Sequence, residues 1–189
     1  MKFEIENEKI AYSGFLKVLR ADVIHEAVHN GDSIHATREC LERGDSVAVL
    51  IYEKDTDSFL FTRQFRYPSA RRNNPWMLEL VAGSIDGDEE GQVAARREVK
   101  EEIGFEIQDL EKVMTYFPSP GGCSEQITIY YAQVNSSQQV TKEGGKTEEK
   151  EDIELVRIKK DEAKKMLQKG AFNNSISIIG LQWFFLKKG

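Results

Sequence analysis

Apolar and polar positions recur with two different periods along this chain, and together they predict a sheet flanked by a few helices. Residues 46–52 are almost continuously apolar, which is typical of a strand buried on both faces. A turn at residues 55–57 leads into a second strand over residues 58–62. We expect further extended segments over residues 75–82, 106–117, 126–134 and 153–158.

Helices are expected over residues 92–103, 161–168 and 176–185. In the first of these, Ala95, Val99 and Ile103 recur at every fourth position and form an apolar stripe for a core. Gly104 follows, where a helix-ending residue in the left-handed conformation belongs. Strands mixed with a few helices in no regular alternation favour an α+β fold or a mixed α/β sandwich over a barrel or a Rossmann sheet.

The N-terminal segment follows a separate pattern of extended runs. Residues 15–24 partly alternate, residues 30–32 are a hairpin signal, and a second extended run continues toward Leu41. Two or three strands bury too little apolar surface to stand alone, so they should pack on the rest of the chain or on a second copy. We therefore expect a β subdomain over residues 1–44 and a larger domain over residues 45–189.

The composition fits one globular domain with a small appendage, since 40% of the 189 residues are hydrophobic and 31% are charged. The net charge of −6, from 26 Lys and Arg against 32 Asp and Glu, disfavours a nucleic-acid partner. No apolar run approaches the roughly 20 residues of a membrane span, and residues 1–6 have no signal-peptide character. With two distant cysteines, Cys40 and Cys123, we expect a reduced cytoplasmic protein without a membrane partner.

The helix expected at residues 92–103 carries three glutamates on adjoining turns. Glu98 and Glu102 share one ridge, and Glu101 lies three residues after Glu98. Each like-charge pair is unfavourable by roughly a few tenths of a kcal/mol, so a divalent cation would turn repulsion into affinity. All-oxygen ligands select a hard ion such as Mg²⁺ or Mn²⁺ over Zn²⁺. On the helix alone, a solvated acidic face is the simpler alternative.

A longer spacing across residues 83–105 is far more specific. Glycine is followed after five residues by Glu, after seven more by Arg-Glu, and then by an aliphatic residue, any residue, Glu-Glu, any residue, Gly and an apolar residue. The chain matches this pattern without a gap or substitution at Gly83, Glu89, Arg97, Glu98, Val99, Glu101, Glu102, Gly104 and Phe105. The pattern is the Nudix box. The chain resembles the Nudix hydrolases, which use a divalent metal to hydrolyse a nucleoside diphosphate linked to another moiety.

The resemblance extends over nearly the whole chain. It is similar to the ADP-ribose pyrophosphatase subgroup at residues 79–83, 119–125, 149–153 and 179–183. Hydrolases of other nucleoside diphosphate sugars, including the GDP-mannose type, share much of this pattern. The resemblance implies a Nudix α/β/α sandwich with a mixed sheet, preceded by a small antiparallel β subdomain that is swapped between the chains of a homodimer.

The resemblance also implies a set of metal ligands. Glu98 and Glu102 match the two metal-binding glutamates of the box, and Glu101 matches an additional or water-mediated ligand. The backbone carbonyl of Ala82 matches a further ligand in this subgroup. Arg97 would orient the carboxylates, and it also has the spacing of an ordinary ion pair with Glu101.

Residues 135–152 are polar and rich in Glu and Lys, and they predict a long mobile loop. The resemblance places two catalytic residues there, Glu149 as general base and Glu151 as metal ligand or helper. The order of these two roles stays open. A solvated run of charges is the alternative interpretation.

The substrate-binding residues are likewise implied by the resemblance. Arg66 matches an arginine that meets the pyrophosphate, and a guanidinium suits bidentate phosphate binding; a surface arginine at a strand end is the alternative. Phe15 would stack on the base, with Arg38 on its other face, although core packing is an equal alternative for Phe15. Glu79 and Glu125 match positions near the sugar or phosphate.

The expected activity is metal-dependent hydrolysis of ADP-ribose to AMP and ribose 5-phosphate. A broad-specificity or GDP-mannose-type nucleoside diphosphate sugar hydrolase is the nearest alternative. A sanitiser of oxidised nucleoside triphosphates is disfavoured by the N-terminal β segment. A non-catalytic sensor of ADP-ribose is disfavoured by the intact box and by the lack of room for a DNA-binding domain.

Overall fold

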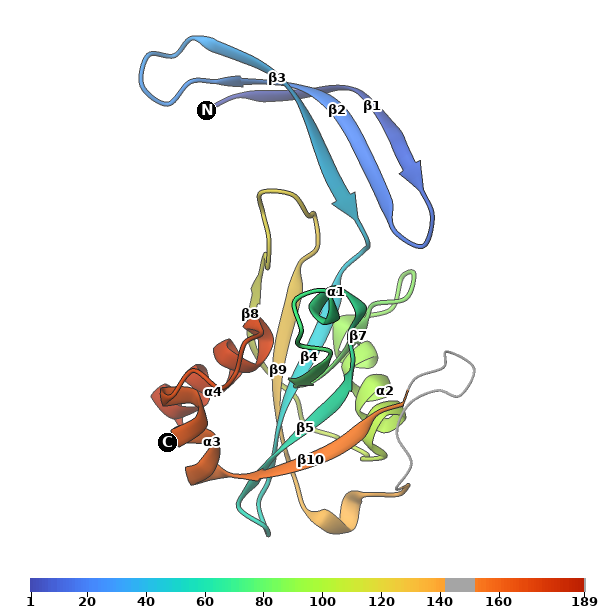
Figure 1. Ribbon diagram of the computed structural model, residues 1–189, viewed down its shortest axis with the longest axis vertical. Coiled ribbons are helices and arrows are strands. Elements are labelled where there is room, and N and C mark those ends of the chain that lie inside the picture. The colour runs from blue at the N-terminus through green and yellow to red at the C-terminus, as the bar shows by residue number, and fades with distance from the viewer. Residues whose placement is uncertain (142–151, 189) are drawn as a thin grey trace. The chain divides into compact units, whose positions relative to one another are not determined.

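The protein is described here by a computed structural model that covers residues 1–141 and 152–188 (Figure 1). It divides into two compact units, one of Met1–Asp45 with Phe117–Gln126 and one of Ser46–Tyr116 with Ile127–Gly189. The elements in chain order are β1 (Phe3–Ser13), β2 (Lys17–Glu26), β3 (Ser33–Glu42), β4 (Ser46–Glu53), β5 (Ser58–Phe65), α1 (Tyr67–Ala70), β6 (Trp76–Glu79), β7 (Val81–Ser84), α2 (Gly91–Ile103), β8 (Glu111–Tyr116), β9 (Ile127–Val134), η1 (Ser136–Gln138), β10 (Glu154–Lys159), α3 (Lys160–Gln168) and α4 (Ser175–Lys187).

The larger unit contains one mixed sheet of seven strands, in the order β10-β5-β4-β9-β8, with β6 paired to β5 and β7 paired to β4. β4 and β9 run parallel, and the other pairs are antiparallel. The short strand β7 pairs with the beginning of β4, with Ala82 opposite Ala48. The glycine that opens the Nudix pattern, Gly83, therefore lies beside the central strand.

Two hydrophobic clusters cover the opposite faces of this sheet. Side chains alternate along β4, so Val47, Val49 and Ile51 pack in the cluster that includes α2. Ala48 and Leu50 point the other way, into the cluster formed with α3 and α4. Figure 1 shows the helices on the two sides of the sheet. The α/β/α sandwich is confirmed, and burial on both faces explains the continuous apolar run of this strand.

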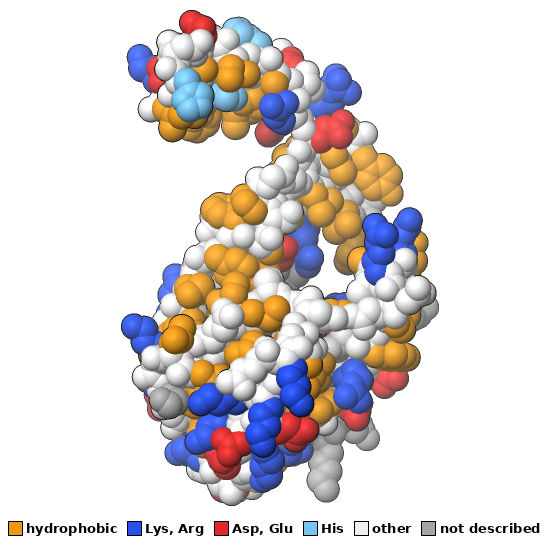
Figure 2. Space-filling model, turned by 60° about the vertical axis from the view of Figure 1, so that its left-hand side comes forward, with side chains coloured by type: hydrophobic (Ala, Val, Ile, Leu, Met, Phe, Trp, Pro, Cys, Tyr) orange, Lys and Arg blue, Asp and Glu red, His pale blue; other side chains and the backbone are white. Residues whose placement is uncertain are grey.

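The smaller unit contains an antiparallel sheet in the order β1-β2-β3. Among residues 1–45, Ala21 is the one buried residue. Large apolar side chains are exposed on this unit, and orange groups mark several of them in the upper part of Figure 2. They include Phe3, Ile5, Ile10, Tyr12, Phe15 and Ile34. A three-stranded sheet with so little buried apolar surface has little stability of its own.

A segment distant in sequence completes the smaller unit. Leu41 donates its backbone N–H to the carbonyl of Gly122 at 2.8 Å, and Ser124 donates its own to the carbonyl of Leu41 at 3.2 Å. Strand β3 is therefore joined by backbone hydrogen bonds to the connection between β8 and β9.

Several elements differ from the expectations of the sequence pattern. Strand β1, which the sequence pattern did not single out, is irregular at Asn7, whose φ is +51°, and its register shifts between Glu6 and Lys9. The strand expected over residues 106–117 is shorter and spans Glu111–Tyr116, and before it Phe105 forms an isolated bridge with Gln139. The two short turns α1 and η1 carry no periodic signal because each spans about one turn.

No helix within the described residues is both long and apolar enough to cross a membrane.

Candidate active site

Helix α2 carries the predicted carboxylates and packs its other face on the sheet. Its buried apolar residues are Ala95, Val99 and Ile103, as the stripe predicted, and also Ala94, which lies outside that stripe. The helix ends at Gly104, which has φ +70° and donates its backbone N–H to the carbonyl of Lys100 at 3.1 Å. The predicted left-handed helix end is confirmed, and it fixes where the last turn stops.

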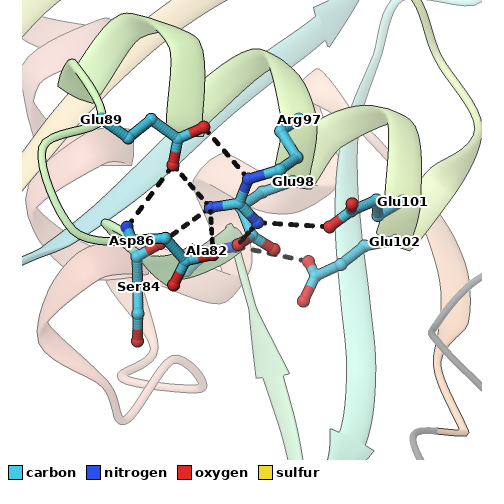
Figure 3. A network of polar contacts seen from close by, with 8 residues as sticks. All are labelled: Ala82, Ser84, Asp86, Glu89, Arg97, Glu98, Glu101 and Glu102. Atoms are coloured by element: carbon cyan, nitrogen blue, oxygen red, sulfur yellow. Dashed lines mark hydrogen bonds and ion pairs between the residues drawn. The ribbon is translucent and has the colours of Figure 1, made fainter. Parts of the chain in front are cut away.

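Arg97 is the centre of the polar network on α2 (Figure 3). Its Nε and Nη2 donate to the two carboxylate oxygens of Glu89 at 3.2 and 2.9 Å. Its Nη1 donates to Glu98 at 2.6 Å and to Glu101 at 3.3 Å. Nη2 also donates to the carbonyl of Ser84 at 3.0 Å. One guanidinium thus holds three glutamates of the box together with the strand that precedes it.

The glutamates around Arg97 stabilise its positive charge. The hydrogen bonds with Glu89 are the largest cause that raises the pKa of the Arg97 guanidinium above its usual value. Burial opposes them, and Glu98 adds to the rise. The side chain of Arg97 is 23% exposed, so its ion pairs are partly shielded from solvent. The cation offsets the repulsion among glutamates that the spacing predicted, and the ion pair with Glu101 is present as well.

Gly83 is required by the position of Glu98. A Cβ atom added at Gly83 would overlap the Glu98 carboxylate, which lies directly against the backbone of β7. The fixed glycine at the start of the Nudix pattern thus has a packing reason. A side chain at this position would move the carboxylate, which is the flexible end of Glu98, away from the strand.

Glu102 is nearly buried, with 4% of its surface exposed. The backbone N–H of Ala82 donates to its Oε2 atom at 3.3 Å, and Figure 3 shows the two residues facing each other. A solvated acidic helix face does not explain this side chain, because a carboxylate is strongly disfavoured in the interior unless polar partners surround it. The spacing of Glu98 and Glu102 therefore directs both groups toward β7.

The donor set fits a hard divalent cation in chemistry, although its oxygens are not yet gathered around one point. Among residues 1–141 and 152–188, no group of three His, Cys, Asp or Glu side chains is close enough to hold a metal ion. Glu98 and Glu101 face Arg97, whereas Glu102 faces Ala82. The three carboxylates nevertheless lie on successive turns of one helix and offer only oxygen ligands.

Arg66, directly after β5, forms an ion pair with Glu79, the last residue of β6. The Nε atom of Arg66 donates to Glu79 at 2.8 Å, and the arginine side chain is 41% exposed. Glu79 is largely buried, so it holds one edge of the guanidinium in place. Among the described residues it is the one hydrogen-bonding partner of this guanidinium.

Three further predicted residues belong to the smaller unit. Phe15 is completely exposed, so core packing within one chain does not explain it. Arg38 is exposed and donates to the carbonyl of Thr37 at 3.1 Å. Glu125 is buried, with its Oε1 3.7 Å from Arg43. The predicted catalytic residues Glu149 and Glu151 lie outside the described residues.

Two participants in the network were not recognisable as partners from the sequence. Glu89 accepts two hydrogen bonds from Arg97 across eight positions, and the carbonyl of Ser84 accepts a third. The fixed place of Glu89 in the box is a signal for its importance. The position alone does not predict where the Glu89 side chain points, because the loop between β7 and α2 sets its orientation.

The comparisons with known proteins agree with this geometry. Residues 42–174 match the NUDIX domain. The chain is 35% identical over 188 residues to the ADP-ribose pyrophosphatase of Haemophilus influenzae, which covers 97% of this chain and 86% of that relative. It is 31% identical over 185 residues to the GDP-mannose pyrophosphatase of Enterobacter sp. strain 638, with 97% and 95% covered. The chain belongs to the Nudix family.

A solved structure shares the fold over its full length. It is a crystal structure of an ADP compounds hydrolase, with a TM-score of 0.73 and 23% sequence identity. The match covers 100% of this chain and 97% of that one. At this identity the likeness establishes the fold.

We expect Gly83→Ala to lower the free energy of unfolding by about 1 kcal/mol, because the Glu98 carboxylate must move away from β7 and from its hydrogen bond with Arg97. Urea denaturation followed by circular dichroism measures this change. Gly121→Ala is the matched control, since a Cβ there meets nothing within 4 Å, and it should change the stability by less than about 0.5 kcal/mol. Equal stability of the two variants would contradict the tight packing of Glu98 on Gly83.

Proposed function

We propose that this chain hydrolyses the pyrophosphate bond of ADP-ribose in the presence of a divalent metal ion. Water adds to one phosphorus, the bond from the bridging oxygen to that phosphorus breaks, and AMP and ribose 5-phosphate leave. The observation that carries the proposal is the direction of Glu98 and Glu102 toward Gly83 and Ala82, on the helix of an intact Nudix box. The relatives named ADP-ribose pyrophosphatase support the choice of substrate.

The proposed ligands of the metal are Glu98, Glu102 and the Ala82 carbonyl, with Glu101 and Glu151 as further ligands. In an extended strand the N–H and C=O of one residue point to the same side. The Ala82 carbonyl is therefore on the side where the Ala82 N–H meets Glu102. Oxygen donors select Mg²⁺, with Mn²⁺ as a substitute. The chemistry gained with the ion is neutralisation of phosphate charge and a lower pKa for bound water.

Arg97 positions the carboxylates in this proposal. It holds Glu98 and Glu101 while its own orientation is fixed by Glu89 and by the Ser84 carbonyl. A cation in this place keeps the glutamates close together before a metal enters. The carboxylates can then exchange one positive partner for another with little rearrangement of the helix.

Arg66 binds the pyrophosphate in this proposal. Glu79 uses only the Nε edge of its guanidinium. No other residue in the described ranges uses the two terminal nitrogens of Arg66, which suit phosphate oxygens in the bidentate geometry that arginine favours. Glu79 thus orients the arginine, and with Glu125 it is the proposed contact of the sugar or the phosphate.

The proton of the attacking water is assigned to a general base in residues 142–151. We assign that role to Glu149, and the role of metal ligand or helper to Glu151. The similarity of residues 149–153 to the subgroup supports the assignment. It leaves the order of the two roles to experiment.

The chain is proposed to act as a homodimer in which each N-terminal β subdomain serves the partner's site. The smaller unit supports this idea, because it buries only Ala21 among residues 1–45 and exposes several large apolar side chains. Phe15 would stack on the nucleobase and Arg38 would lie on its other face. The free thiols of Cys40 and Cys123 suit the cytoplasmic location that we propose.

A nucleoside diphosphate sugar such as GDP-mannose is the second candidate substrate. The relative named GDP-mannose pyrophosphatase, which the chain matches over 97% of its length, favours it. Stacking on Phe15 would accept any nucleobase and so gives little selection between adenine and guanine. The sensor hypothesis is disfavoured because every fixed position of the box is present.

A product assay with purified protein tests the activity. ADP-ribose, GDP-mannose, UDP-glucose and an oxidised dGTP are each incubated with and without Mg²⁺. We expect metal-dependent release of AMP from ADP-ribose, and a fall in kcat of roughly 10²–10³-fold for Glu102→Gln, which removes one charged ligand. Glu162→Gln, an exposed glutamate on α3, should stay within about twofold of the unchanged protein. Binding of ADP-ribose without turnover of any compound would favour the sensor.

Glu149→Gln and Glu151→Gln separate the two roles in residues 142–151. Loss of a general base lowers kcat by roughly 10²–10⁴-fold, so we expect that loss for Glu149→Gln. Glu151→Gln should instead raise the Mg²⁺ concentration for half-maximal rate. The measurement is initial rate against Mg²⁺ concentration for both variants. The opposite pattern would reverse the assignment.

Sedimentation at micromolar concentration tests the homodimer. We expect a mass of two chains, and Phe15→Ala should raise KM for ADP-ribose by roughly 5–150-fold, because base stacking contributes about 1–3 kcal/mol. Its kcat should change little, since the stacked base is remote from the reacting phosphorus. A monomer that keeps full activity would disprove the shared site.

A further inference from the structure

A second arginine network connects the sheet to the C-terminal end of α2. Arg157, on β10, donates from Nε to both carboxylate oxygens of Glu53 at 3.3 and 3.1 Å. Its Nη2 donates to Glu53 at 3.3 Å and to the side-chain carbonyl of Gln139 at 3.1 Å. Gln139 then donates from Nε2 to the backbone carbonyl of Ile103 at 3.2 Å. Four segments far apart in sequence are joined in this way.

Burial of the Glu53 carboxylate is unfavourable because the charge loses its hydration, so a contribution to stability alone does not explain this residue. It is 0% exposed, at the end of the central strand β4. Thr56 donates to it at 2.5 Å, in addition to the bonds from Arg157. Desolvation of a buried ion pair often cancels its attraction, so an apolar pair of similar size would be as stable. What the charged pair supplies is a fixed orientation for the Arg157 guanidinium, whose Nη2 donates both to Glu53 and to Gln139.

Backbone contacts hold the same helix end. Val140 donates its N–H to the carbonyl of Gly104 at 2.7 Å, and Phe105 forms a bridge with Gln139. The Arg157 guanidinium lies 6.0 Å from the centre of the Phe105 ring. A Cβ at Gly104 would overlap Thr141. The last turn of α2 is thus enclosed by the segment that runs from η1 to residue 141.

We infer that Arg157 and Gln139 are positioning residues for the metal-binding glutamates. Ile103 directly follows Glu102, so a hydrogen bond to the Ile103 carbonyl fixes the height and rotation of the turn that carries Glu101 and Glu102. Arg97 acts on the carboxylates directly, whereas Arg157 acts through Gln139 and the backbone. This inference rests on the proposed metal site, because positioning matters only if those carboxylates bind an ion.

Two variants of one residue separate positioning from simple packing. Gln139→Met keeps the length of the side chain and removes both hydrogen bonds. Gln139→Glu keeps an acceptor for Arg157 but removes the N–H that Ile103 accepts from. The Arg157–Glu53 pair remains in both, so the sheet should fold, and circular dichroism with a thermal melt verifies this. Arg157→Lys is a third variant, which keeps the charge opposite Glu53 and loses the fork.

The readout is binding of Mn²⁺ to the protein without substrate, titrated by electron paramagnetic resonance. We expect all three variants to weaken Mn²⁺ binding by about tenfold. This is the lower end of the loss in metal affinity seen when residues that orient metal ligands are replaced. The Mg²⁺ concentration for half-maximal rate should rise by a similar factor, with little change in kcat at saturating Mg²⁺. Arg63→Gln is the matched control. Like Glu53 and Arg157, Arg63 and Glu154 form an ion pair to strand β10, at 3.0 Å, but this pair is exposed. Its Mn²⁺ affinity should be unchanged.

Glu102→Gln is titrated in parallel and distinguishes the two ways of failing. If it leaves Mn²⁺ binding unchanged, the proposed metal site itself is wrong. If it abolishes binding while folded Gln139→Met and Gln139→Glu bind Mn²⁺ within twofold of the unchanged protein, only the positioning role is disproved. A loss in Gln139→Met that Gln139→Glu does not share would also contradict the route through Ile103, because only the contact with Arg157 would then matter.

Discussion

The contact of Arg97 with three glutamates is the interaction on which the site depends. Glu98, Glu101 and Glu89 would repel one another at this spacing, and the guanidinium makes their proximity favourable. The same arginine also donates to the carbonyl of Ser84. Charge neutralisation and the attachment of α2 to the preceding strand are therefore one structural feature. In the metal site that we propose, an ion would take over partners that a cation already holds in place.

The fold supplies the second constraint, which is the closeness of α2 to β7. Glu98 lies against Gly83, and Glu102 accepts a hydrogen bond from Ala82. Both contacts require β7 to pair with the start of β4 and α2 to pack on the same face of the sheet. Directly after Glu102, the carbonyl of Ile103 accepts a hydrogen bond from Gln139, which Arg157 of β10 holds in turn. The carboxylates are thus held between a fixed strand and a fixed helix end.

The two units differ in how much of their apolar surface is buried within one chain. The larger unit has apolar clusters on both faces of its sheet. The smaller unit exposes Phe3, Ile5 and Tyr12 on a sheet that buries almost nothing. Local alternation is enough to form such strands, but their stability depends on what covers them. A second chain is the occupant that we propose, because it would also bring Phe15 to a substrate.

The sequence by itself determined the family, the helix that carries the carboxylates and most strands of the larger unit. These features rest on local periodicity and on one strict spacing, from Gly83 to Phe105. Only the tertiary structure decided that Glu89 and Ser84 hold Arg97, and that Gln139 connects Arg157 and its partner Glu53 to the end of α2. The reason is that periodicity assigns a residue to one face of its own element. Which distant side chain lies opposite depends on strand pairing and helix packing, which bring together positions as far apart as 53 and 157.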